Sequence, residues 1–165
     1  MMKKTMKKFS TAACVLGLST IGLMSVDVTK AASDTAQALA VVTAAINIAQ
    51  VSDLDFGSSV QGDAASTVAP GDGTAAEFAV TGQANTAYTI TLPADATVTM
   101  ITGAGATADE QIGVNSFVST PAAGANGLLD GSGAQTLNVG ATRDALSATQ
   151  VAGNYSANFT VDVVY

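Results

Sequence analysis

The chain has 165 residues, is rich in Ala, Gly, Thr, Val and Ser, contains no histidine or tryptophan, and carries a net charge of −7. This length suits a single domain. The acidic balance excludes attraction to nucleic acid phosphates or to an anionic membrane surface. The missing histidine excludes Ser–His and Cys–His catalysis and imidazole metal sites.

Residues 1–31 have the features of an export signal. Four lysines lie within the first eight residues, the stretch from Phe9 to Val26 is apolar apart from scattered Ser and Thr, and small residues follow at Ala31 and Ala32. We expect cleavage after Ala31, with residues 36–38 as an alternative site. An uncleaved membrane anchor is disfavoured, because no stop-transfer pattern follows. The only cysteine, Cys14, lacks the preceding apolar stretch of a lipoprotein signal.

Removal of residues 1–31 leaves 134 residues with twelve acidic side chains and one basic side chain, Arg143, a net charge of about −11. No cysteine remains, so the exported domain has no disulfide and must be held together by its core or by a partner. We expect passage through the periplasm and a final location at the cell surface or outside the cell.

The segment after the signal is small and apolar, with Leu39, Val41, Val42, Ile46 and Ile48 among many alanines. Alanine favours a helix by propensity, but the alternation of Ile46 and Ile48 favours extended structure, which we predict. A free tail has little reason to be apolar. The segment is therefore predicted to pair with a sheet edge, either its own or that of a neighbour.

Glycine and Asp-Gly turn signals recur about every ten residues from Gly57 to Gly153, which predicts a β-sandwich or β-barrel. Strands are predicted at residues 76–81, 88–92, 96–101, 111–118 and 135–139. The clearest strand is the last one, from Gly153 to Tyr165. Its alternate residues are predicted to be buried on one face over its whole length: Tyr155, Ala157, Phe159, Val161, Val163 and Tyr165.

Acidic residues are the only remaining candidates for catalysis or metal binding. The pairs Asp53/Asp55 and Asp109/Glu110 are formal candidates for carboxylate catalysis, and loop acids for calcium. Neighbouring acids in a strand alternate faces and no EF-hand spacing is present, so solvated loops are favoured. Residues 103–108 fit a dinucleotide-binding pattern but lack the helix that it requires. We therefore expect no enzyme activity, no cofactor and no metal.

Several short motifs resemble a known family of small exported bacterial proteins, described as a pilin-like domain of unknown function and similar to the alpha-class chaperone-usher pilins. They cover most of the predicted exported chain in order: Leu54-Asp55-Phe56-Gly57, Phe78-x-Val80-x-Gly82, Tyr88-Thr-Ile-Thr-Leu-Pro93, Leu137-Asn-Val-Gly-Ala-Thr142 and Gly153-Asn-Tyr155 leading to Val161-Asp-Val-Val-Tyr165.

The resemblance implies an immunoglobulin-like β-sandwich that lacks one strand and is completed by the N-terminal extension of the next subunit. Together with the export signal at residues 1–31, it implies a donor extension (32–43) and a pilin-like domain (44–165). Partners would be copies of itself or related pilins, a periplasmic chaperone and an outer-membrane usher. Residues carried over as the donor strand are Ala36, Ala38, Leu39, Ala40, Val41 and Val42, and as the groove border Tyr155, Phe159, Val161, Val163 and Tyr165.

Two functions follow as expectations. The first is a structural pilus or fimbria subunit that assembles by donor-strand exchange on the bacterial surface. The second is a secreted or surface binding domain that is self-complemented, which means that its N-terminal segment completes its own sandwich. Carbohydrate is the candidate ligand. The missing disulfide and the alanine-rich donor keep this second function open.

Overall fold

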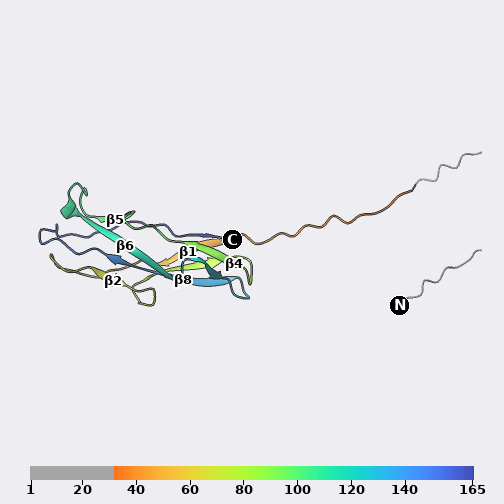
Figure 1. The fold of residues 1–165 in the computed structure, drawn as a ribbon, viewed down its shortest axis with the longest axis horizontal. Coiled ribbons are helices and arrows are strands. Elements are labelled where there is room, and N and C mark those ends of the chain that lie inside the picture. Colours follow the sequence, from red (N-terminus) through yellow and green to blue (C-terminus); the bar gives the residue numbers. More distant parts are fainter. Residues whose placement is uncertain (1–31) are drawn as a thin grey trace, which may run out of the picture. The chain divides into compact units, whose positions relative to one another are not determined.

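The computed structural model describes residues 32–165 (Figure 1). The predicted export signal at residues 1–31 lies outside the described residues. Residues 32–46 have no regular secondary structure, and residues 32–45 are exposed. The remaining chain forms strands and one short 3-10 helix in this order: β1 (Asn47–Ser52), β2 (Ser66–Val68), β3 (Ala76–Thr81), β4 (Ala87–Thr91), β5 (Val98–Ile101), η1 (Ala108–Glu110), β6 (Gln111–Thr120), β7 (Gly124–Leu128), β8 (Ala134–Arg143) and β9 (Asp162–Val164).

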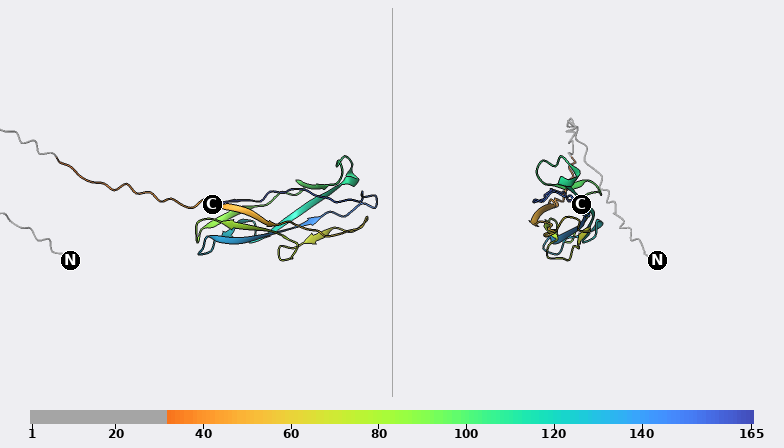
Figure 2. Two further views of the ribbon diagram at one scale, coloured as in Figure 1. Left: turned by 180° about the vertical axis from the view of Figure 1, so that it is seen from behind. Right: turned by 90° about the vertical axis from the view of Figure 1, so that its left-hand side faces the viewer.

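The strands form two antiparallel sheets, so the fold is all-β and sandwich-like, with one curled sheet (Figures 1 and 2). The larger sheet has the order β1-β3-β8-β6-β5, with β2 paired to β8. The smaller sheet has the order β7-β4-β9. Strands β1 and β9 therefore lie at an edge of their respective sheets, and each has a single pairing partner.

The main core lies between the two sheets. Val80 of β3 and Leu137 and Val139 of β8 are fully buried against Tyr88 and Ile90 of β4. A second cluster forms around Val98, Val114 and Ala141, and Phe117 and Phe159 pack against both clusters. Buried side chains alternate with less buried ones in β4 and in the first half of β6, as a pleated strand with one buried face requires. The five predicted internal strands correspond to β3, β4, β5, β6 and β8, so these predictions are confirmed.

The structure differs from the sequence-based predictions at β7, where glycines at 124 and 127 indicated a turn. Gly127 pairs with Tyr88, and a Cβ atom at Gly127 would collide with the Tyr88 ring. The missing side chain makes room for this buried ring, whose hydroxyl donates a hydrogen bond to Gln135. Glycine here serves close packing between strands rather than a turn.

The C-terminal segment is also less regular than predicted. It pairs with β4 only over β9 and with Ile101 through a single bridge at Ser156. Ala157 is exposed and Tyr165 is 44% exposed, so the prediction of continuous one-sided burial is wrong at these two positions. The segment lacks a strand partner on its other side, and an unpaired edge is less constrained to ideal strand geometry.

The turn between β7 and β8 is built around the carboxylate of Asp130. Its Oδ1 atom accepts hydrogen bonds from the Ser132 hydroxyl at 2.7 Å and from the backbone N–H groups of Ser132 and Ala134 at 2.8 and 2.9 Å. The Ser132 hydroxyl, followed by the backbone donors of Ala134 and Ser132, holds the pKa of the Asp130 carboxyl below its usual range. Hydrogen bonds donated to a carboxylate stabilise its charged form and therefore lower its pKa.

This lowered pKa predicts an acid-dependent part of the stability. Because the folded pKa is below the unfolded one, the contribution is complete above the ordinary aspartate pKa and is lost as pH falls through the folded value. Between about pH 5 and pH 2, the melting temperature of Asp130→Asn should therefore fall less than that of the wild type. Thermal denaturation followed by circular dichroism across this range measures the difference, and parallel curves would contradict the role of Asp130.

Candidate functional site

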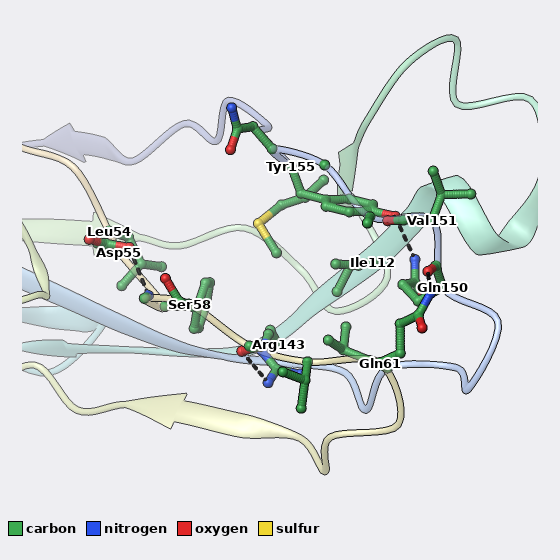
Figure 3. Close-up of a pocket in the computed structure, with 18 residues that line it drawn as sticks. Leu54, Asp55, Ser58, Gln61, Ile112, Arg143, Gln150, Val151 and Tyr155 are labelled. Carbon is green, nitrogen blue, oxygen red and sulfur yellow. Dashed lines mark hydrogen bonds between the residues drawn. The ribbon is translucent and has the colours of Figure 1, made fainter.

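Two neighbouring pockets lie between residues 50–61 and residues 150–159, and we refer to them together as the groove, with a wide part and a narrow part. Its wide part is a cavity of about 650 Å³ lined on one side by residues 54–61, which follow β1, and on the other by residues 150–155. Its narrow part, about 80 Å³, lies between Gln50 and Asp53 on one side and residues 157–159 on the other. Figure 3 shows the segment that carries Tyr155 and Val151 facing the segment that carries Leu54 and Ser58.

Only the narrow part of the groove borders strand edges that pair on one side. The narrow part lies beside β1, which pairs only with β3, and beside the segment that leads into β9, which pairs only with β4. An unpaired strand edge presents backbone N–H and C=O groups that another extended chain can satisfy. The groove therefore offers backbone pairing and apolar contact together.

The interior of the groove carries aromatic and aliphatic side chains beside polar groups. Phe78 and Phe159 line the narrow part, and their ring centroids lie 6.3 Å apart at an interplanar angle of 78°. The ring centroids of Phe117 and Phe159 lie 5.2 Å apart. In the wide part, Phe56, Met100 and Ile112 belong to the lining. Such a lining suits small aliphatic side chains.

The wide part also contains a buried cation. Arg143, the last residue of β8, is 4% exposed and belongs to the cavity lining (Figure 3). Its Nη1 atom donates to the backbone oxygen of Asp144 and its Nη2 atom to the Ser59 hydroxyl, each at 2.8 Å. Its Nε atom is buried without a hydrogen-bond partner, and no carboxylate of residues 32–165 forms an ion pair with it.

The C-terminal rim of the wide part is anchored by hydrogen bonds. The buried Gln150 amide donates to the backbone oxygens of Asp109 and Gln111 at 2.7 and 3.1 Å. The Tyr155 hydroxyl lies 2.8 and 2.6 Å from the backbone oxygens of Asp109 and Val151. Because these contacts tie residues 150–155 to η1 and the start of β6, the wide part is held open by the fold.

The predicted groove residues lie at different places. Tyr155 lines the wide part and Phe159 the narrow part, whereas Val161 is buried in the main core and Val163 packs against it. Tyr165 lies at the other end of the C-terminal segment, where its hydroxyl accepts a hydrogen bond from the backbone N–H of Gln83. The predicted donor residues are exposed: Ala36, Ala38, Leu39, Ala40, Val41 and Val42.

Two of the four acidic candidates accept hydrogen bonds from nearby backbone N–H groups. Glu110 accepts hydrogen bonds from the backbone N–H groups of Ala106 and Thr107 at 2.7 and 3.1 Å, and Asp55 accepts one from Gly57 at 2.8 Å. Within residues 32–165 there is no group of three or more acidic, cysteine or histidine side chains placed to hold a metal ion. The glycines at 103 and 105 lie in a loop with positive φ angles of 57° and 62°.

Sequence reasoning missed three parts of the groove: residues 54–61, Gln150 and Arg143. The available signal was Arg143, the only basic residue after position 31, because an isolated charge in so acidic a chain suggests a specific partner. In the described part of the chain, none of the helices has the length and apolar character to span a membrane.

Comparison with known proteins places the domain in a family. No curated protein and no solved structure matches the chain. The family described as "Domain of unknown function (DUF4402)" matches residues 46–165, which include every strand and both parts of the groove. The chain belongs to the DUF4402 family.

Proposed function

We propose that this protein is a structural subunit of a bacterial pilus or fimbria, exported to the cell surface and assembled by donation of its N-terminal extension into the groove of a neighbouring copy. The observation that carries the proposal is the narrow part of the groove, which contains Phe78 and Phe159 and lies between β1, paired only with β3, and the segment that leads into β9, paired only with β4. In this proposal the sandwich is immunoglobulin-like, and the donated segment supplies its missing strand.

The extension has the properties that such a groove requires. Leu39, Val41 and Val42 are 87%, 95% and 93% exposed, although exposed side chains of this kind gain free energy from burial. No charged residue occurs between Asp34 and Asp53. Residues 36–42 span about 23 Å when extended, at about 3.3 Å per residue, which is the length of an ordinary strand.

Burial and backbone pairing together favour a stable assembly. If five small apolar side chains enter the groove, each contributes on the order of 1 kcal/mol, so burial alone supplies several kcal/mol. Contacts in which each copy donates to the next do not close on themselves and produce a filament. A periplasmic chaperone and an outer-membrane usher are the proposed partners during export, because the open groove needs protection before the donor arrives.

The experiment compares the protein that comprises residues 32–165 with a version that begins at Thr43, using denaturing gels with and without heating. We expect ladders that dissociate on heating for the full version and none for the truncated one. The double variant Leu39→Asp/Val41→Asp, which keeps the chain length, should also lose the ladder. A full-length protein that stays monomeric, with a truncated form that is only less stable, would support self-complementation instead.

A further inference from the structure

We propose that the wide end of the groove is a carboxylate-binding subsite centred on Arg143. The inference concerns the same groove as the proposed assembly but is carried by this side chain alone. Arg143 is the only basic residue after position 31, is 4% exposed, and forms no ion pair within residues 32–165. Keeping a charge out of water without a counter-charge is costly, so a site that retains such a charge suits an anion.

The hydrogen bonds of the guanidinium show which of its edges is open to a ligand. Nη1 is engaged by the backbone oxygen of Asp144, which is fixed by the fold. The opposite edge consists of Nε, which has no partner, and Nη2, which donates only to the Ser59 hydroxyl. A carboxylate has two oxygens at the spacing of these two donors and binds them in parallel.

Ser59, within residues 57–60, occupies one of the two donors of that edge. Nη2 donates to its hydroxyl in this structure, so a carboxylate that takes both Nε and Nη2 displaces the Ser59 hydroxyl. This segment is exposed, Val60 is 69% exposed, and none of residues 57–60 belongs to a strand. Replacement of one neutral hydroxyl by a carboxylate would satisfy Nε and Nη2 together and would neutralise the charge.

The surroundings select a carboxylate attached to an apolar or extended body. The cavity of about 650 Å³ has the size of a small-molecule site and also contains Phe56, Met100, Ile112 and Tyr155. Two sources carry this chemistry. One is Asp34, the only acid of the extension, donated by a second copy; the other is a free organic acid.

The test uses the unique arginine of the exported chain. In ¹⁵N-labelled protein that comprises residues 32–165, Arg143 gives the only arginine Nε–H signal, which needs no further assignment. We titrate sodium acetate, sodium glucuronate, neutral acetamide, and two synthetic peptides of residues 32–46, one with the natural sequence and one with Asp34→Asn. We expect a carboxylate-dependent downfield shift and slower solvent exchange of this signal, and no response to acetamide.

The titrations with different ligands show whether the carboxylate comes from the extension or from a free acid. They also test this inference independently of strand donation. A response to the natural peptide and not to the Asp34→Asn peptide assigns the site to the extension, and would place its N-terminal end at Arg143. A response to acetate or glucuronate alone assigns it to a free acid. If both peptides shift groove amides equally while the Nε–H signal stays unmoved by every carboxylate, this inference is overturned and strand donation stands.

Variants of the two partners provide a second readout. Arg143→Lys keeps the charge but lacks the two parallel donors, and should weaken binding of the active carboxylate about tenfold or more. Ser59→Ala removes the competing hydroxyl and should bind at least as tightly as wild type, measured by the same titration on groove amides. Weaker binding by Ser59→Ala, or unchanged binding by Arg143→Lys, would contradict the proposed edge.

Discussion

Protein carrying Val41→Cys together with Asn158→Cys is expected to form disulfide-linked ladders under mild oxidation. Asn158 lines the narrow part of the groove, and Val41 lies in the middle of the proposed donor segment. The only natural cysteine is Cys14, so residues 32–165 give no background cross-links. Because a disulfide needs Cα atoms about 4.4–6.8 Å apart, the bond forms only if the extension enters the groove.

The control places the second cysteine at an exposed position on β5 instead of in the groove. Thr99 lies on β5 between the inward residues Val98 and Met100 and is exposed. Val41→Cys with Thr99→Cys should remain uncross-linked. Since neighbouring residues of a strand face opposite sides, Val42→Cys with Asn158→Cys reports the alternate register. A cross-link confined to single chains would indicate self-complementation, and none in either register would reject strand donation.

Phe159→Ala is expected to lower the free energy of unfolding by about 2–4 kcal/mol. Phe159 packs against Phe78 and Phe117 and contacts both core clusters, so its removal leaves a cavity where the C-terminal segment meets the larger sheet. The loss should be below that of a fully buried phenylalanine, because Phe159 is only half-buried.

Chemical denaturation of the monomeric protein measures this loss, with the exposed neighbour Thr160→Ala as the matched control, which should lie within about 0.5 kcal/mol of wild type. Phe159→Ala also widens the narrow part of the groove, so ladders formed by this variant should dissociate at a lower temperature than wild-type ladders. A loss below about 1 kcal/mol would show that the C-terminal segment contributes little to the core.

Alternation predicted the strands that have one buried face. Val80 and Leu137, for example, lie in clear period-two patterns and form the core as expected. It failed at β7, because two glycines carry no pattern and the role of Gly127 depends on Tyr88, a partner 39 residues away in sequence. Register across such distances is set by packing, which a single strand does not reveal.

The residues that line the two pockets were only partly among those named from the sequence. Tyr155 and Phe159 were named from the resemblance, whereas residues 54–61 were not, because they form no strand and have no periodic pattern. The role of Arg143 could not be predicted from the sequence either. Composition counted its charge, but only the three-dimensional structure places it inside a cavity without an acidic partner.

The burial of Arg143 has a practical consequence for handling this protein. A protease that cuts after arginine or lysine finds a single target beyond position 31, and that target ends a paired strand with its side chain covered. Folded material should survive digestion intact, while unfolded chains should be cut once into two fragments of predictable mass. One gel lane can thus report the fraction of properly folded protein in any preparation.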